Sequence, residues 1–341
     1  MHFPVRTSLI VTYWCLPLLL ASGAEPPQRR FEFQQVHMGT QFRIVLYGSD
    51  EESAGRASQI SFQRIAELEQ ILSDYRADSE LMQLCQQAGN GSVPVSPDLF
   101  AVLSRAEQIS ELSDGAFDVT VGPVVRLWRR GRRMRKLPDL DRIGEARGLV
   151  GYRKVCLDRK ARSVQLLQAG MQLDLGGIAK GYAADEVMSQ LRRLGFPRAL
   201  VAAAGDIVVG DAPPETQGWS IAIAPGGTGE EQPDSFLLLH NAAVSSSGDI
   251  EQFVEIDGKR YSHIVDPRTG VGLTDRIAAT VVAPDGVTCD PLATALCVMG
   301  PERGLKLVDS WDHVAARIVR WTDHGIEIHE SERFCKIPRA E

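Results

Sequence analysis

The sequence predicts an α+β fold. Segments with helical spacing of apolar residues mix irregularly with short segments rich in β-branched residues, and no strand–helix–strand unit repeats as it would in a doubly wound sheet. The chain has 341 residues, 44% hydrophobic and 24% charged, with a formal net charge of −7. This composition is typical of a globular protein of one large or two modest domains, and the negative charge argues against a general nucleic-acid-binding surface.

The first 24 residues predict an export signal rather than part of the fold. Arg6 precedes an apolar run over 8–20, and the small residues Ser22-Gly23-Ala24 follow where cleavage would occur. The run is short and is interrupted by Pro17, so we do not expect an ordinary transmembrane helix; an uncleaved membrane tether is the alternative. Cys15 lies inside the run, which argues against lipid attachment.

The N-terminal half predicts a strand hairpin followed by helices. Residues 33–47 form the hairpin around Met38-Gly39-Thr40. One helix is indicated by the helical spacing of Phe62, Ile65, Leu68 and Leu72 and stops before Ser73, and another begins after Ser96-Pro97, a cap and first-turn pair. Residues 126–136 hold seven basic side chains. A solvated loop is the simpler interpretation of that stretch, and binding of an anionic partner or ligand is the other.

The C-terminal half mixes both element types. The pattern predicts helices over 182–194, 290–299 and 301–310, strands over 199–203, 207–209, 219–224, 236–239, 253–256 and 277–282, a Gly/Glu/Pro loop over 225–233, and a closing hairpin of 314–319 with 326–329. There is no internal repeat and no clear linker, so we expect residues 30–341 to form a single domain. The five cysteines outside the signal are an odd number without C-x-x-C spacing; they predict at least one free thiol, with Cys289 and Cys297 buried.

Two segments carry the strongest chemical pattern. Residues 174–181 (DLGGIAKG) end a predicted strand and open a predicted helix, where free N–H groups, a helix N-terminus and Lys180 suit a phosphate-bearing ligand. Plain packing is the alternative for such a diglycine. Residues 263–270 (HIVDPRTG) hold a histidine, an aspartate and an arginine in a Pro/Gly turn, although His263 alone is more often structural.

A third segment predicts a hard-metal site. Asp290 and Thr294 stand at i and i+4 of an expected helix start, so their oxygens share one face. By itself, Asp290 before Pro291 would be a simple N-cap. The chain lacks the Walker, dinucleotide-binding, zincin and hydrolase-elbow motifs. Together the three segments predict phosphoryl-type chemistry on a nucleotide.

In order along the chain, these motifs resemble those of the ApbE family, the FAD:protein FMN transferases. The matching segments are Gly115-Ala116-Phe117-Asp118-Val119-Thr120, residues 174–185, Ala204-Gly205-Asp206, Ser246-Ser247-Gly248-Asp249, residues 263–270 and residues 290–294. The resemblance extends from about Met38 to Gly304. It implies a T-fold-like α+β architecture with antiparallel sheets and packed helices, and export to the periplasm or cell envelope of a bacterium.

The resemblance also implies the reaction and its partners. FMN would pass from FAD to a threonine or serine hydroxyl of a target protein with Mg²⁺, leaving a phosphoester-linked flavin and AMP. Acceptors would be flavoprotein subunits such as those of Na⁺-pumping NADH:quinone oxidoreductase or Rnf-type complexes. The competing functions are an exported FAD-binding protein, which has no use for a base or a metal pair, and a Mg²⁺-dependent FAD pyrophosphatase that uses water.

Site residues follow from the resemblance position by position. FAD contacts are expected from Met38, Tyr75 (by stacking), Ala116, Phe117, Asp118, Asp174 and Lys180, with Lys180 near the pyrophosphate. Mg²⁺ would be held by the carbonyl of Gly177 with Asp290 and Thr294. His263 and Ile264 would lie over the reacting end, with His263 as the base. The chain departs from the family at Trp128-Arg129-Arg130-Gly131, at Ser246 and at Ala204, where the family has Trp-Gly-Phe-Gly, threonine and glycine.

Overall fold

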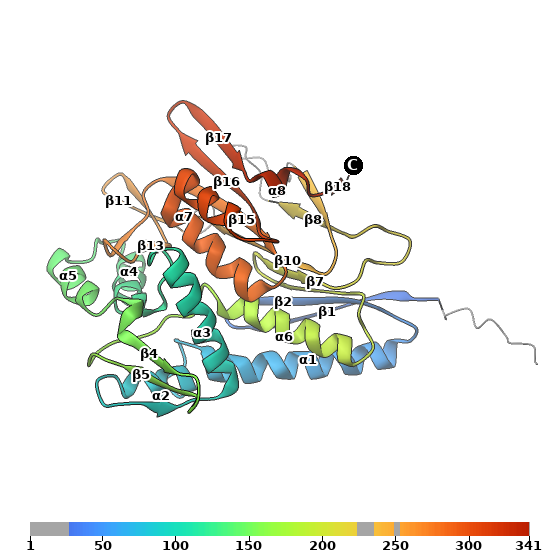
Figure 1. Ribbon diagram of the computed structural model, residues 1–341, viewed down its shortest axis with the longest axis horizontal. Helices are drawn as coiled ribbons and strands as arrows, with labels where there is room; N and C mark the ends of the chain where they lie inside the picture. Colours follow the sequence, from blue (N-terminus) through green and yellow to red (C-terminus); the bar gives the residue numbers. More distant parts are fainter. Residues whose placement is uncertain (1–26, 224–234, 249–252, 341) are drawn as a thin grey trace, which may run out of the picture.

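An antiparallel sheet forms the centre of the molecule in the computed structural model, which describes residues 27–223, 235–248 and 253–340. Its eight strands run in the order β1-β2-β6-β7-β10-β15-β16-β17 (Figure 1). They are β1 (Arg29–His37), β2 (Thr40–Gly48), β6 (Ala199–Ala203), β7 (Asp206–Val209), β10 (Ala242–Gly248), β15 (Arg276–Ala283), β16 (Ala315–Thr322) and β17 (Gly325–Glu330). The predicted α+β class with antiparallel sheets and packed helices is confirmed.

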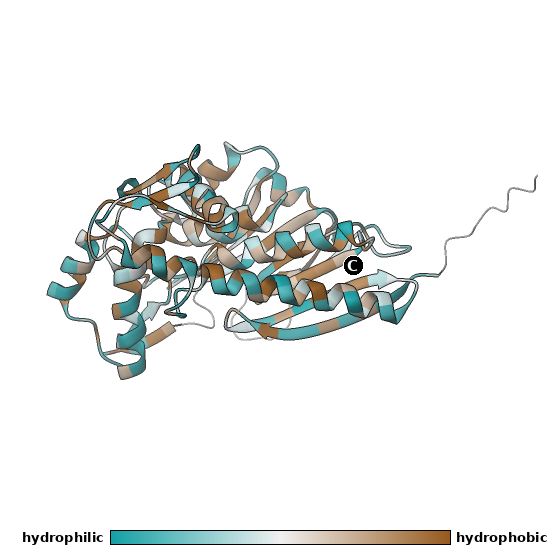
Figure 2. Ribbon diagram, turned by 90° about the horizontal axis from the view of Figure 1, so that it is seen from below, coloured by the Kyte–Doolittle hydropathy of each residue, from teal (hydrophilic) through white to brown (hydrophobic). Residues whose placement is uncertain are grey.

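Four long helices lie on one side of this sheet. They are α1 (Glu51–Leu72), α3 (Pro97–Leu112), α6 (Ala179–Arg193) and α7 (Gly286–Asp309) (Figure 1). Helices α1, α6 and α7 pack against its strands, and α3 packs on α1 and α7. Their apolar residues form the largest core together with Ile44 and Leu46 of β2. Brown and teal segments alternate along these helices in Figure 2, as amphipathic helices require. The predicted caps are confirmed at α3, where Ser96 accepts from the backbone N–H of Leu99 and Pro97 occupies the first turn.

A second core lies on the opposite face of the sheet. Val45, between Ile44 and Leu46 in β2, points to this side because successive strand residues alternate. The face is covered by a three-stranded sheet and a short helix, namely β8 (Trp219–Ile223), β9 (Ser235–Leu239), β18 (Arg339–Ala340) and α8 (Glu332–Cys335). Trp219, Leu237 and Phe334 fill the space between the layers.

Smaller elements complete the fold. A three-stranded sheet contains β3 (Val93–Pro94), β4 (Val155–Asp158) and β5 (Ser163–Leu166), with α2 (Glu80–Gln86) nearby in Figure 1. A third core joins Trp128 to Ile143 and Tyr261. It is built by α4 (Gly122–Met134), α5 (Leu140–Gly148) and the short hairpin strands β11 (Phe253–Ile256), β12 (Lys259–Ser262), β13 (Val265–Asp266) and β14 (Val271–Gly272). Two 3-10 turns, η1 (Val119–Val121) and η2 (Tyr152–Lys154), flank it.

The structure corrects three expectations about local structure. The basic stretch 126–136 is mostly helix α4 rather than a loop, because Val124, Trp128 and Gly131 recur at helical spacing and are buried. The strand expected to end just before the diglycine does not form, since residues 171–175 belong to no sheet. The helix expected to start at Asp290 begins at Gly286, where the side chain of Asp285 caps it.

Other expectations are confirmed or lie outside the described residues. The two helices predicted over 290–310 form α7 with a kink at Gly300, whose φ is 73°. The five cysteines of the described chain are free, and Cys289 and Cys297 are buried as predicted. The expected signal over 1–24 and the loop over 225–233 lie outside the described residues. Within the described part of the chain, none of the helices has the length and apolar character needed to cross a membrane.

Candidate active site

The candidate site lies at one end of the strands of the central sheet. The β1–β2 turn holds Met38, and the β6–β7 turn holds Ala204 and Gly205 at the same end, because Phe42 of β2 pairs with Ala203 of β6. Ala204 adopts a φ of 55°, a left-handed conformation that glycine takes more easily. Gly205 cannot carry a side chain, since a Cβ there would lie 2.7 Å from the carbonyl oxygen of Ser246.

Lys180 contacts residues of three predicted motifs at this end of the sheet. Its Nζ lies 3.3 Å from Oδ2 of Asp206 and 3.7 Å from Oδ2 of Asp290, and it donates to the carbonyl oxygen of Gly176 at 2.8 Å. Lys180 comes from the first turn of α6, Asp206 opens β7, and Asp290 lies in α7. A single ammonium group therefore sits between two buried carboxylates that are far apart in the sequence.

A close approach of α6 and α7 sets this geometry. The backbone N–H of Gly181 donates to Oδ2 of Asp290 at 3.2 Å. A Cβ on Gly181 would meet the carbonyl of Gly286 and would lie 2.5 Å from its carbon. Asp185, one turn further along α6, accepts from the N–H groups of Gly286 and Val287 at 2.7 and 2.8 Å. The backbone at the start of α7 is thus held directly against α6.

Burial controls the charges of the site. Burial is the main reason that the pKa of Asp290 is raised to about 7, and the negative charge of Asp206 adds to this rise. The positive charge of Lys180 lowers the pKa of Asp290 but does not outweigh them. Burial would lower the pKa of Lys180, but the carboxylates of Asp290 and Asp206 outweigh it and hold that pKa well above its usual range. Lys180 therefore stays charged and available to a phosphate, with its side chain 23% exposed.

The residues proposed as metal ligands lie together. A Cβ on Gly177 would be 3.2 Å from Oγ1 of Thr294, so the diglycine turn contacts α7 directly. Oγ1 of Thr294 also lies 3.3 Å from Oγ of Ser247 and 3.4 Å from the carbonyl oxygen of Asp290. Among the described residues there is no group of three or more His, Cys, Asp or Glu side chains arranged for a metal. One buried carboxylate with hydroxyl and carbonyl oxygens is nevertheless a hard-oxygen set that fits Mg²⁺ sharing its coordination with phosphates and water.

A second cluster surrounds Asp174. Its Oδ1 accepts from the N–H of Gly176 at 2.8 Å, and its Oδ2 accepts from Arg129 of α4 at 2.7 Å. Arg129 also pairs with Asp74, and its guanidinium stands 4.3 Å from the ring centroid of Tyr75. The Tyr75 residue is 77% exposed, so the ring still has surface free for stacking. Burial and the charge of Asp174 raise the pKa of Asp74, while Arg129 opposes them.

The segment 116–118 reaches the diglycine turn through Phe117. An atom of the Phe117 ring would lie 3.4 Å from a Cβ on Gly177. Ala116 is buried, and so is Asp118, whose carboxylate accepts from the N–H and hydroxyl of Thr120 and from the N–H of Tyr152. Burial raises the pKa of Asp118 despite these bonds. With its carboxylate so occupied, Asp118 would reach a ligand through its backbone.

His263 lies between β12 and β13 and is partly buried. Its neighbour Ile264 belongs to the largest core, together with Phe117 and Ile178, and its backbone is anchored by the bond from the N–H of Leu273 to its carbonyl oxygen at 2.9 Å. Both carboxylate oxygens of Asp266 accept from the guanidinium of Arg268, each at 2.9 Å.

Four further residues belong to the site but were not predicted as part of it. Asp206 was found only as part of the Ala-Gly-Asp motif, and Ser247 only as part of the Ser-Ser-Gly motif. Arg129 was noted only as part of the basic stretch and of the Trp128-Arg129-Arg130-Gly131 departure, and Asp74 had no signal, since a contact between a helix and a distant loop leaves no spacing pattern in the sequence. The structure brings Gly177, Lys180, Asp290 and Thr294 together. Met38 lies in the turn between β1 and β2, and Tyr75 lies against the guanidinium of Arg129.

This fold and site define one protein family. The model of the ApbE family matches residues 38–318. Among solved structures, the flavin transferase ApbE from Vibrio cholerae aligns with a TM-score of 0.83 and 28% identity, covering 92% of this chain and 100% of that chain. The apo flavinyl transferase ApbE of Pseudomonas stutzeri aligns with a TM-score of 0.81 and 30% identity, covering 91% and 97%. The chain belongs to the ApbE family.

Relatives by sequence carry a more specific description. The FAD:protein FMN transferase of Haemophilus influenzae is 34% identical over 314 residues, which cover 88% of this chain and 89% of the relative. That of Treponema pallidum is 34% identical over 330 residues, covering 90% and 91%. By this homology the chain is an enzyme of the transferase class.

Proposed function

We propose that this chain transfers FMN from FAD to a serine or threonine hydroxyl of a second protein, in a Mg²⁺-dependent reaction that releases AMP. The observation that carries the proposal is the meeting of Lys180, Asp290 and Thr294 beside the Gly176-Gly177 turn. A cation, hard oxygens and a helix N-terminus at one point suit a pyrophosphate.

The chain's own residues supply positioning and proton transfer. The hydroxyl oxygen of the acceptor bonds to the phosphorus on the FMN side, the bond from that phosphorus to the AMP oxygen breaks, and His263 takes the hydroxyl proton. Lys180 stabilises charge on the phosphate oxygens, while Tyr75 and Asp174 hold the nucleotide. Gly177, Asp290 and Thr294 would hold Mg²⁺, which supplies further positive charge to the phosphates when bound.

One assay separates the proposal from its alternatives. The enzyme is incubated with FAD, Mg²⁺ and an acceptor, for which the flavin-carrying subunit of an Rnf-type complex is suitable, and flavin fluorescence is read on a denaturing gel. We expect a fluorescent acceptor band that chelator abolishes and Mg²⁺ restores, and Asp290→Ala should not be rescued. Free FMN without labelled protein would indicate a pyrophosphatase, and recovery of intact FAD would indicate a binding protein. Full transfer in excess chelator would remove the metal from the mechanism.

We also propose that the chain acts in the bacterial cell envelope. The support is the apolar run 8–20 followed by Ser22-Gly23-Ala24, which has the pattern of a cleavable signal. N-terminal sequencing of the protein from fractionated cells should give a start near Glu25 in the envelope fraction. Recovery of the intact chain from the cytosol alone would contradict export.

A further inference from the structure

One helical surface beside the site takes no part in the proposed reaction. Arg126, Arg130 and Arg133 are spaced at i, i+4 and i+7 in α4, so they form one stripe, and all three are exposed. Arg135 and Lys136 are exposed too and continue the positive charge past the end of the helix. We refer to these five residues as the α4 basic face.

The α4 basic face carries uncompensated charge. Within the described part of the chain, none of its five residues forms an ion pair, whereas Arg129, which is only partly exposed, pairs with Asp74 and Asp174. The stretch 126–136 contains no acidic residue, although α5 adds Asp141 and Glu145 beyond it. The sign of the charge on this surface is opposite to that of the whole chain, whose formal net charge is −7. An acidic partner would therefore be attracted here and repelled by the molecule overall.

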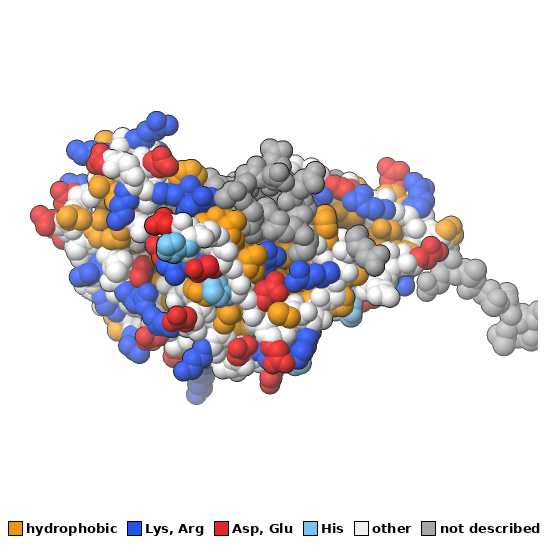
Figure 3. Space-filling view, turned by 90° about the horizontal axis from the view of Figure 1, so that it is seen from above, with side chains coloured by type: hydrophobic (Ala, Val, Ile, Leu, Met, Phe, Trp, Pro, Cys, Tyr) orange, Lys and Arg blue, Asp and Glu red, His pale blue; other side chains and the backbone are white. Residues whose placement is uncertain are grey.

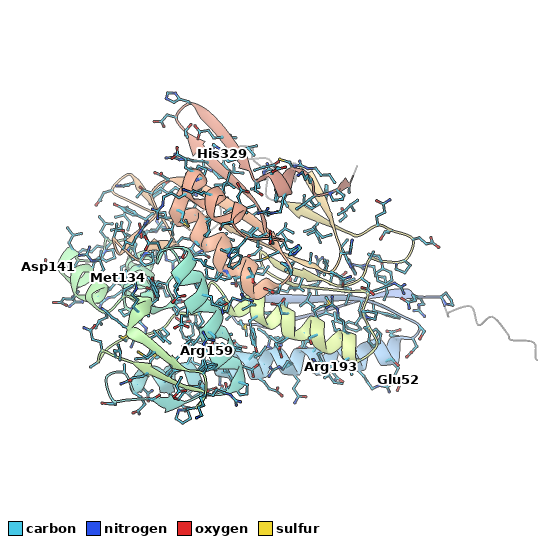
Figure 4. The ribbon with its side chains drawn as sticks, in the orientation of Figure 1. Glu52, Met134, Asp141, Arg159, Arg193 and His329 are labelled. Carbon is cyan, nitrogen blue, oxygen red and sulfur yellow. The ribbon has the colours of Figure 1, made fainter. Side chains whose placement is uncertain are left out.

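Exposed apolar side chains border the same surface. Met134 at the end of α4 is 59% exposed, Leu137 in the connection to α5 is 38% exposed, and Leu140 at the start of α5 is 79% exposed. Met134 and Asp141 are labelled at the same end of the molecule in Figure 4, and in Figure 3 hydrophobic side chains at this end lie among both basic and acidic ones. Apolar residues surrounded by charged ones are the usual composition of a protein–protein contact.

The α4 basic face is connected to the candidate active site through helix α4 itself. Arg129 lies one residue before Arg130, and its guanidinium contacts the Asp174 carboxylate and the Tyr75 ring. A molecule bound to the α4 basic face would therefore sit next to residues proposed to hold FAD. The face also lies at the end of the molecule opposite to the start of β1 (Figure 1).

We propose that the α4 basic face, with Met134, Leu137 and Leu140, is the docking surface for the acceptor protein; the inference rests on the proposed function. The matching surface of the acceptor would present acidic side chains around a few apolar ones. An anionic membrane fits less well. The apolar side of α4, with Val124, Trp128 and Gly131, is buried in the protein, so the helix has no continuous apolar face to insert into lipid.

The test uses the full enzyme, FAD, Mg²⁺ and the same acceptor subunit as the transfer assay. Reversing charge with Arg130→Glu and Arg133→Glu together should raise the KM for the acceptor about tenfold or more, because like charges then face each other. The Kd for FAD should stay unchanged. A matched control, Arg193→Glu with Lys306→Glu, reverses two exposed cations on α6 and α7 and should leave both values unchanged. Added salt should raise the KM of the wild type and narrow its difference from the reversed variant.

Three outcomes would overturn the docking surface. The first is an acceptor KM that does not change in the reversed variant while the wild type transfers flavin normally. The second is an equal rise in the control variant, which would indicate net charge rather than a surface. The third is loss of cosedimentation with phosphatidylglycerol vesicles in the reversed variant without change in the acceptor KM, which would assign the face to a membrane. Absence of transfer by the wild type would instead refute the proposed function.

Discussion

Lys180 is the residue on which the charge balance of the site depends. It lies against Asp206 and Asp290, both buried, and no other cation lies within 4.0 Å of either carboxylate in the described chain. Removing one partner from a buried ionic group commonly costs about 3–5 kcal/mol, because the remaining charge stays buried. A substitution of Lys180 will therefore lower stability as well as FAD affinity, so unfolding must be measured beside any titration.

His263 is the residue whose chemical role is most directly testable. A threonine hydroxyl is a poor nucleophile until it loses its proton, and an imidazole can accept that proton near neutral pH. We predict that His263→Ala binds FAD and Mg²⁺ normally but loses about 10²–10⁴ in transfer rate, the usual contribution of a general base. Single-turnover kinetics with an acceptor measure the loss, and FAD titration shows that binding is intact.

The alternative for His263 is a purely structural role. In that case the variant would melt earlier but would transfer flavin at nearly the wild-type rate once folded and loaded. His324, exposed in the β16–β17 turn, offers a matched histidine whose replacement by alanine should change neither property. A folded, FAD-loaded His263→Ala enzyme with near wild-type transfer would rule out the base.

The sequence was sufficient to predict which short local motifs lie close together. Lys180, Gly177, Asp290 and Thr294 were predicted from segments about 110 residues apart, and the structure places them in one cluster. Asp290 was nevertheless assigned to a helix start, because an Asp–Pro pair is typical of an N-cap; the real cap is Asp285. Arg129 could not be predicted, since its partners lie on separate segments and are brought together only by tertiary packing.

At the scale of elements, the contact between α6 and α7 sets the geometry of the proposed metal site. Gly181→Ala would push a methyl group into the Gly286 carbonyl. We predict a loss of about 1–3 kcal/mol or more, because backbone cannot move aside as a flexible side chain can. The shift should also weaken the Mg²⁺ dependence of transfer, since Asp290 accepts from Gly181. Urea unfolding and a Mg²⁺ titration of transfer measure the two effects.

A glycine in another helix provides the control. Gly55 lies in α1, and a Cβ built there has no atom within 4 Å. Gly55→Ala should be neutral or should stabilise by about 0.5–1 kcal/mol, because alanine loses less backbone entropy in a helix. Equal effects of the two substitutions would mean that helix propensity, rather than the close approach, governs Gly181.

The same helix pair should give stability a distinct pH dependence. Burial raises the pKa of Asp185 to about 7, although two N–H groups of α7 oppose the shift. Between its ordinary value of 3.8 and about 7, the folded chain keeps a proton that the unfolded chain has released. This group's contribution therefore falls as pH rises through that window, by about 1.4 kcal/mol per unit at most, and is constant above it.

Asp185→Asn isolates that contribution. The variant loses one acceptor for α7 and should be less stable at low pH, but it should lose less stability than the wild type between about pH 5.5 and pH 8. Urea unfolding at both pH values gives the difference, and slopes common to both proteins, including that of Asp290, cancel. Parallel pH profiles would contradict the raised pKa of Asp185.

Elements with one apolar face were predicted from the sequence, and elements that depend on tertiary partners were not. The helices α1, α3 and α6 and the hairpin β1–β2 follow the expected periodicity. Strand β10 was missed because its serines lack the usual strand pattern, yet it pairs with both β7 and β15. Those serines are tolerated because they bond to neighbours, as Ser245 does to Asp206 and Ser246 to Thr280.

At the scale of the whole molecule, three cores share one chain. The largest lies between the helices and the sheet, the second lies behind the sheet, and the third joins α4 and α5 to the hairpins after β10. The third core holds Val265 of the 263–270 segment, and Nε1 of Trp128 donates to the carbonyl oxygen of Gly270 at 2.9 Å, whereas Ile264 packs in the largest core. The proposed role of His263 as a base therefore depends on α4 staying packed.

The proposal that residues 30–341 form one domain predicts that these cores unfold together. Trp311 packs on the first core, Trp219 lies in the second and Trp128 in the third, so each core has its own fluorescent reporter. In variants that keep one of the three, with the remaining tryptophans changed to phenylalanine, the urea transition by fluorescence should coincide with that by circular dichroism. A Trp128 signal that changes at lower urea than the circular dichroism would show that α4 and α5 unfold separately. The proposed docking surface and the His263 segment would then belong to a unit of lower stability than the proposed metal site.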